Sequence, residues 1–203
     1  MSDAPEFTDY VADILKEVGN IGAAHAATAL SELIQEQVNM TVPSARMVPF
    51  REVPELLGGE EMLSAGVITQ IKGSLSGNLL LVMAAESAVQ LVTRLLPAES
   101  KGVQDFTAMD FSALAEVGNI LGGSFINAIS DLTGFTLHVT VPGVAVDMAG
   151  AILSICLLSA ELTMDEALLV ETSISQGTSS IDAHIILIPE PDSMDRLLKA
   201  LGA

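Results

Sequence analysis

The sequence predicts an α/β (α+β) sandwich in which a tandem duplication places two long, motif-bearing helices on one shared β-sheet with pseudo-twofold symmetry. The motif Glu17-Val18-Gly19-Asn20-Ile21 recurs 99 residues later as Glu116-Val117-Gly118-Asn119-Ile120. Twenty-two residues then separate each asparagine from a proline, Pro43 or Pro142. A repeated motif with an equally spaced distant residue is the signature of an internal repeat. We therefore predict a single duplicated domain over residues 1–203, with repeats at about 8–97 and 105–203.

In the first repeat, helical spacing of apolar residues predicts a helix over residues 9–37. Strand-like stretches follow at 40–48, 65–71 and 77–83, and a second helix is expected at 85–96. Gly73 marks a hairpin turn. The continuous apolar run at 79–83 is typical of a strand that is buried on both faces.

The second repeat follows the same order, with a long helix at 107–132 that Thr107 or Asp110 is placed to cap. Strands are expected at 136–141, 151–158, 167–175 and 183–188, and a closing helix at 192–201. Residues 177–180 mark another hairpin turn, and the run at 185–188 again predicts a strand buried on both faces. Residues 97–102 form the junction between the repeats, and 161–166 are an extra segment of the second.

The composition restricts the partners. The chain has 203 residues, half of them hydrophobic, and a formal net charge of −18. This charge argues against a nucleic-acid surface or docking on anionic lipid, and it suits partners with basic patches. No apolar run predicts a membrane span, and the polar N-terminus predicts no signal peptide, so we expect a cytoplasmic protein. Cys156, the single cysteine, is expected to be a small buried hydrophobe.

The repeated motif places polar side chains on one face of each long helix. Asp13, Glu17 and Asn20 have the spacing i, i+4, i+7, and Ser112, Glu116 and Asn119 repeat it. Each motif also contains a glycine, which costs about 1 kcal/mol in a helix relative to alanine. A close approach of another segment, or an amide fixed in place, is the expected reason for accepting that cost twice.

Three interpretations of the motif remain open from the residues alone. In the first, Glu and Asn bond to a neighbouring loop and glycine permits tight packing. The second is a metal site, although each face offers at most two carboxylates and no helical histidine, and His25, His138 and His184 are scattered. The third is a phosphoryl-transfer surface, where an amide orients water and a carboxylate binds a partner's cation.

The pattern [Asp/Ser]-x₃-Glu-x₂-Asn-x₂₂-Pro, present twice, resembles the CheC family of bacterial and archaeal chemotaxis. The resemblance covers nearly the whole chain and favours the third interpretation. It implies a phosphatase that hydrolyses the aspartyl-phosphate of the response regulator CheY at two sites.

Residue roles follow from this resemblance. Asn20 and Asn119 would position water for in-line attack, and Glu17 and Glu116 would pair with the regulator's active-site lysine. Asp13 and Ser112 would support the sites, while Pro43 and Pro142 would shape the following turn. The resemblance implies no metal of its own, since Mg²⁺ would be supplied by the regulator.

The resemblance also implies alternatives. One is a non-catalytic binding module that regulates the receptor deamidase CheD. For it, residues 146–152 are either an accessory helix with Asp147 as the contact or an ordinary turn that leads into the strand expected at 151. The other is a scaffold like the flagellar switch proteins. Both Glu and Asn pairs are kept, and no additional C-terminal switch domain of the FliY type is expected, which favours the two-site phosphatase.

Overall fold

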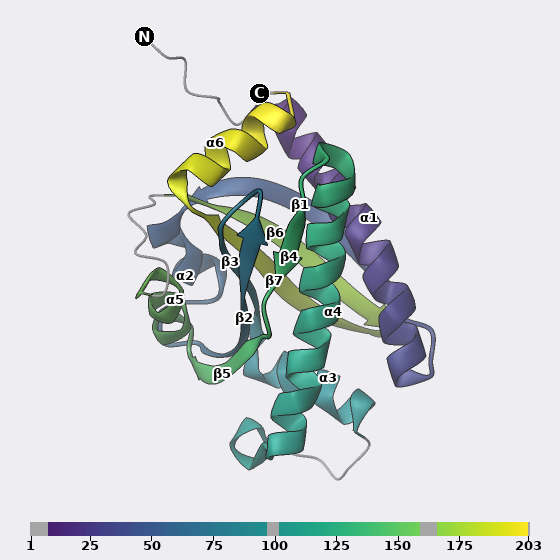
Figure 1. The fold of residues 1–203 in the computed structure, drawn as a ribbon. Helices are drawn as coiled ribbons and strands as arrows, with labels where there is room; N and C mark the ends of the chain where they lie inside the picture. Colours follow the sequence, from purple (N-terminus) through teal and green to yellow (C-terminus); the bar gives the residue numbers. More distant parts are fainter. Residues whose placement is uncertain (1–7, 97–101, 159–165, 203) are drawn as a thin grey trace.

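The computed structural model describes residues 8–96, 102–158 and 166–202, and centres on one antiparallel sheet (Figure 1). The strand order is β1-β6-β7-β3-β2-β4, and β5 also pairs with β2. The strands are β1 (Asn39–Pro49), β2 (Leu63–Gly73), β3 (Gly77–Ala84), β4 (Leu137–Val139), β5 (Gly143–Met148), β6 (Glu166–Gln176) and β7 (Ser179–Pro189).

Helices cover both faces of this sheet. One face carries α1 (Asp9–Ile34), α3 (Ala85–Leu95), α4 (Ala108–Thr133) and α6 (Pro191–Ala200). The other face carries the short α2 (Val53–Leu56) and α5 (Ala149–Leu158). Figure 1 shows α1 and α4 side by side across the front of the sheet. These layers confirm the predicted sandwich with two long motif-bearing helices.

The two repeats exchange their first strands. β1 of the first repeat pairs with β6 of the second, while β4 and β5 of the second pair with β2 of the first. The central pair, β3 and β7, lies at the pseudo-twofold axis implied by the symmetric strand order. Each repeat thus completes the sheet of the other.

The central strands are buried on both faces, as their continuous apolar sequences predict. In β3, Leu79 and Leu81 contact the core under the long helices, whereas Leu80 and Val82 contact the core under α2 and α5. The same alternation in β7 places Ile185 with the first core and Ile186 with the second. Burial on both sides is the reason that polar alternation is missing from these strands.

Local signals fix the helix ends. The side chain of Thr8 accepts a hydrogen bond from Val11 N–H at the start of α1, and the residue that follows α1, Gln35, is left-handed with φ 62°. At α4, the Asp110 carboxylate accepts from both the N–H (2.6 Å) and the hydroxyl (2.7 Å) of Thr107. The predicted caps of α4 are both used. The two predicted hairpin turns contain Gly73 and Gly177 at positive φ.

One predicted strand is wrong. Residues 151–158 belong to helix α5, and the accessory helix expected at 146–152 begins only at Ala149, because 146–148 lie in β5. The buried residues of α5 are Ala149, Ile152, Leu153 and Cys156, a helical spacing. The surrounding apolar residues concealed this period in the sequence.

Some predictions fall outside the described residues, namely the polar N-terminus, most of the junction at 97–102 and most of the extra segment at 161–166. Within the described ranges, no helix has the length and apolar character needed to cross a membrane.

Candidate functional site

The first motif lies along the solvent side of α1 where this helix packs beside β1. Asp13 and Glu17 are exposed and Asn20 is half-buried. Next to Asn20, Gly19 faces Val42, and a Cβ added to Gly19 would lie 3.0 Å from Val42 Cγ1. The glycine therefore allows β1 to approach the helix next to Asn20, which is the close approach expected from the sequence.

Asn20 is fixed to β1 by a hydrogen bond. Its side-chain Oδ1 accepts from the backbone N–H of Val42 at 3.0 Å. The register of β1 against β6 shifts between Thr41 and Ser44, so the ladder is irregular at Val42 and Pro43. A bulge leaves a backbone group without its ladder partner, and proline has no N–H to offer. The constant spacing from Asn to Pro thus places a free N–H in reach of the asparagine.

The second motif opens into a hollow. A cavity of about 390 Å³ is lined by the whole predicted set on α4, together with the segment that follows β4: Ser112, Ala115, Glu116, Asn119, Val139, Thr140, Val141 and Pro142. Glu116 and Asn119 are exposed, and Ser112 donates from Oγ to the carbonyl of Ala108 at 2.9 Å. The structure therefore brings the second-repeat residues together around one cavity that is open to a partner.

The two sites differ at the residue before the proline. Val42 is 4% exposed, whereas its equivalent Val141 is 91% exposed. In the second repeat the strand is interrupted between β4 and β5. At this interruption Thr140 donates its N–H to the carbonyl of Gln70 at 2.9 Å, and its Oγ1 accepts from the N–H of Gln70 at 3.1 Å. Among the described residues, the Asn119 side chain has no hydrogen-bond partner, so its amide is free at both ends.

The glycine of the second motif is packed more tightly. A Cβ on Gly118 would lie 2.3 Å from Val67 Cγ1, a distance that real Cβ atoms do not show. Val67 lies on β2, so α4 rests directly on the sheet at this point. Gly22 has a comparable role between the helices, because its Cβ would lie 3.1 Å from the Cα of Phe125. These contacts hold both motifs at fixed positions over one core.

Neither candidate glutamate forms an ion pair within the described parts of the chain. The ion pairs there are Arg46–Glu171 and Arg51–Glu52. Glu17 and Glu116 are both exposed and belong to neither. A partner's ammonium group would therefore meet a carboxylate that no internal salt bridge already neutralises.

The described residues contain no group of three or more His, Cys, Asp or Glu side chains arranged to hold a metal ion. His25 and His138 are exposed. His184 is half-buried, and burial lowers its pKa, opposed by the neighbouring Glu171 and Asp182. Cys156 is fully buried, as expected from the sequence, and burial raises the pKa of its thiol to about 12.

From the sequence, Pro43 and Pro142 were expected to shape the turn that follows each long helix. Both lie further along the chain, at an interruption of a strand. Pro43 lies within β1 and Pro142 between β4 and β5. Asp147 is exposed on β5, away from the hollow at Asn119, and its carboxylate accepts from Met148 N–H at 2.8 Å. The sequence alone did not identify the N–H of Val42 as the partner of Asn20 or Val141 as part of the hollow at Asn119. The proline, read as a break in a strand ladder, was the signal that could have identified them.

Comparison with known proteins places these motifs in a family. A family model described as CheC-like matches residues 11–46 and 109–146, which contain both motifs. The CheY-P phosphatase CheC of Bacillus subtilis (strain 168) is 36% identical over 195 residues, covering 94% of this chain and 93% of that protein. The chain belongs to the CheC-like family.

Solved structures at lower identity share the fold of this CheC-like chain. FliY of Thermotoga maritima superposes with a TM-score of 0.76 at 18% identity, over 96% of this chain and 97% of that one. CheX in the CheX–CheY–BeF₃–Mg²⁺ complex from Borrelia burgdorferi gives 0.50 at 19% identity, over 83% of this chain and 96% of that one.

Proposed function

We propose that this CheC-like protein is a phosphatase that hydrolyses the aspartyl-phosphate of the response regulator CheY. The observation that carries the proposal is the Glu–Asn pair, present on both α1 and α4 at the same helical spacing, with both glutamates exposed and the asparagines half-buried (Asn20) and exposed (Asn119). The name of the Bacillus subtilis relative, CheY-P phosphatase, supports the same activity. The hollow around Glu116 and Asn119 provides room for a partner's phosphorylated side chain.

In this proposal each asparagine positions the attacking water. An amide offers an acceptor and two donors, so it can hold a water while facing a phosphoryl group. The water oxygen bonds to phosphorus as the bond from phosphorus to the aspartyl oxygen breaks. The products are inorganic phosphate and the regulator's free aspartate, and the protons of water remain with phosphate and solvent. Tight orientation alone is worth several kcal/mol in such a step.

The glutamates dock the regulator. A carboxylate beside an anionic phosphoryl group is unfavourable unless a cation separates them, and the regulator's active-site lysine would supply that cation. Glu17 and Glu116 precede the asparagines by one helical turn and face solvent. Asp13 and Ser112, one turn further towards the helix N-terminus, would support this contact.

We also propose that Mg²⁺ comes with the regulator and that the protein acts in the cytoplasm, where a phosphorylated response regulator is found. The solved CheX complex contains CheY, BeF₃ and Mg²⁺, which supports this division between phosphatase and substrate. The phosphatase residues themselves then supply orientation and charge but no nucleophile.

The test is the decay of phosphorylated CheY with Mg²⁺, alone and with the wild-type protein or the double variant Asn20→Ala/Asn119→Ala. We expect the wild type to accelerate decay and the double variant to give the rate of CheY alone. Circular dichroism checks that the variant is folded. A wild type that leaves the decay rate of a cognate regulator unchanged would contradict the proposal.

A second candidate role is regulation of the deamidase CheD through Asp147. This carboxylate is exposed on β5, next to the exposed apolar Met148, and Met148 pairs across the strands with exposed Leu63. Exposed apolar side chains with a polar residue at their rim are typical of protein-binding sites. We expect Asp147→Lys to abolish CheD binding in a pull-down and to leave phosphatase activity intact. CheD binding that survives Asp147→Lys rejects this contact.

A further inference from the structure

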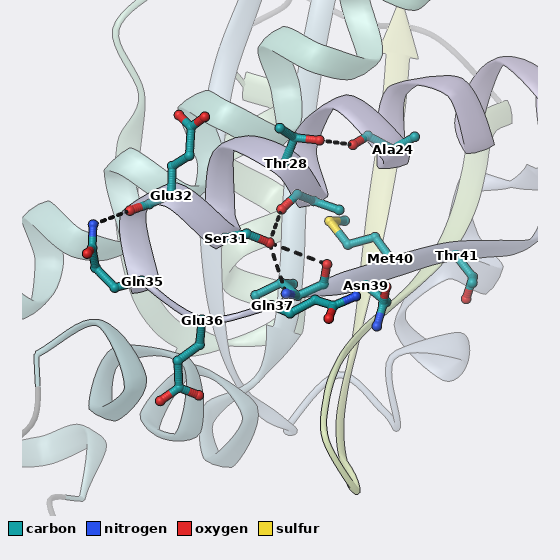
Figure 2. Close-up of a pocket in the computed structure, with 12 residues that line it drawn as sticks. Ala24, Thr28, Ser31, Glu32, Gln35, Glu36, Gln37, Asn39, Met40 and Thr41 are labelled. Atoms are coloured by element: carbon teal, nitrogen blue, oxygen red, sulfur yellow. Dashed lines mark hydrogen bonds between the residues drawn. The ribbon is translucent and has the colours of Figure 1, made fainter.

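A groove continues from the first candidate site along α1. It encloses about 830 Å³ between the C-terminal half of α1 and the beginning of β1. Its helical wall includes Ala24, Thr28 and Ser31, which continue the face that carries Glu17 and Asn20. Figure 2 shows Ser31 facing the segment that leads into Met40 and Thr41, while the Thr28 hydroxyl donates to the carbonyl of Ala24 at 3.0 Å. The groove and the first motif therefore form one continuous surface.

The groove is held open by hydrogen bonds within the protein. Ser31 Oγ accepts from Val38 N–H at 2.9 Å and donates to the carbonyl of Ala27 at 2.7 Å, which ties the loop to the helix (Figure 2). The side chain of Gln35 donates to the carbonyl of Glu32 at 3.1 Å. A surface that is already formed loses little conformational entropy when a partner binds.

The charge of the groove is entirely negative. Its lining includes the carboxylates of Glu32 and Glu36 and contains no lysine, arginine or histidine. Gln176 of β6 donates to Glu36 and holds that carboxylate at the rim, while Glu32 is exposed. Small side chains, Ala24 and Ala27, leave space between the charges. The surface fits a segment that carries basic side chains around small or apolar ones.

The distances place the groove under any partner bound at the first motif. A helix rises about 1.5 Å per residue, so Ser31 lies roughly 16 Å along α1 from Asn20. A standard interface covers about 800 Å² on each partner, the area of a disc with a radius of about 16 Å. A protein that presents its phosphorylated side chain to Asn20 therefore reaches the groove.

We infer that the groove is a docking surface for a basic segment of the phosphorylated response regulator and sets the affinity of the first site. This inference rests on the proposed function. The second repeat has different residues at the corresponding positions: Asn127 in place of Thr28, Asp131 in place of Glu32 and Phe135 in place of Glu36. The groove thus contributes to binding at Asn20 and not at Asn119.

The test uses a background in which the second site is removed by Glu116→Ala/Asn119→Ala. In it, Thr28→Arg fills the groove with a positive charge, and Glu32→Lys reverses the charge at its rim. We expect each to raise KM for phosphorylated CheY roughly tenfold, because like charges at an interface oppose binding. The value of kcat should stay within about twofold, since the groove does not touch the reacting atoms.

Matched controls are Asn127→Arg and Asp131→Lys, which make the same changes of charge at exposed positions of α4. Both should leave KM unchanged in this background. Circular dichroism checks folding, and arginine is a better helix former than threonine. If Thr28→Arg and Glu32→Lys leave KM unchanged while the enzyme is active, the groove inference is wrong and the proposed function stands.

A direct measurement of binding distinguishes failure of the groove inference from failure of the proposed function. Titration calorimetry with CheY, Mg²⁺ and BeF₃ measures affinity without hydrolysis. A wild type that binds CheY but does not accelerate decay rejects the proposed function, and the effect of Thr28→Arg on the dissociation constant still decides the inference. The inference is also overturned if the groove instead joins two copies of this chain. That outcome would be seen as a dimer of the wild type that Thr28→Arg dissociates.

Discussion

The side-chain oxygen of Asn20 accepts a hydrogen bond from the backbone N–H of Val42, whereas the equivalent pair in the second repeat, Asn119 and Val141, makes no such bond among the described residues. Val42 points into the core and Val141 into solvent. The same motif thus exists in one molecule in an anchored and an open form.

This difference predicts unequal effects on stability. Asn20→Ala would leave the N–H of Val42 without an acceptor in a buried position, so the free energy of unfolding should fall by about 1–3 kcal/mol. Asn119→Ala removes an exposed side chain and should change it by less than about 0.5 kcal/mol. Urea denaturation measures both values. Equal losses for the two variants would contradict the anchoring role of Asn20.

The roles of the acceptor oxygen and of the N–H donors of the Asn20 amide can be tested separately. Asn20→Asp keeps an acceptor oxygen for Val42 N–H and removes the two amide donors. We expect most of the stability to remain and the rate of CheY-P decay at this site to fall about 100-fold, as for loss of a positioned reactant. The assay uses the Asn119→Ala background. Full activity of Asn20→Asp would show that the amide donors are not needed.

Glycine at the second motif is expected to be irreplaceable for steric reasons. In Gly118→Ala the new Cβ would lie 2.3 Å from Val67 Cγ1, so the free energy of unfolding should fall by about 1–3 kcal/mol. Gly123 on the same helix has no atom within 4 Å of an added Cβ. Gly123→Ala is therefore the control, and it should stabilise the protein by about 0.5–1 kcal/mol. Thermal denaturation of the two variants tests the contrast.

Burial of Cys156 predicts a loss of stability in alkali. Its pKa is about 12 in the folded protein and 9.0 in its ordinary state, so above pH 9.0 only the unfolded chain releases the thiol proton. The contribution of the protonated thiol to the free energy of unfolding is therefore fully present below pH 9.0. Above that pH the free energy of unfolding falls by about 1.4 kcal/mol per pH unit, up to about pH 12. Urea denaturation between pH 8 and 10 should show this slope in the wild type. Parallel pH profiles for the wild type and Cys156→Ala would exclude it.

Most of the architecture could be predicted from local sequence. Repeated spacing located α1 and α4, and continuous apolar runs identified β3 and β7 because both faces of these strands are buried. The same kind of run misled the prediction at 151–158. There, burial at Ile152 and Cys156 follows a helical period that apolar neighbours such as exposed Ile155 conceal.

The site was predicted in its residues but not in its geometry. Helical periodicity placed Glu116 and Asn119 on one face, and the structure surrounds them with the hollow. The opposite orientations of Val42 and Val141 could not be predicted, since both occur in the same Thr-Val-Pro sequence. Packing of the surrounding segments decides that difference, and local sequence does not encode it.

The exchange of first strands has a consequence during synthesis on the ribosome. The hydroxyl of Ser175 in β6 bonds the carbonyl of Asn39 in β1, a partner 136 residues earlier in the chain. At about 5–20 residues per second, translation takes roughly 7 to 27 s to produce the partner strand after β1. The nascent first repeat must therefore keep β1 from pairing wrongly for that interval, and the sheet closes only when the second repeat has emerged.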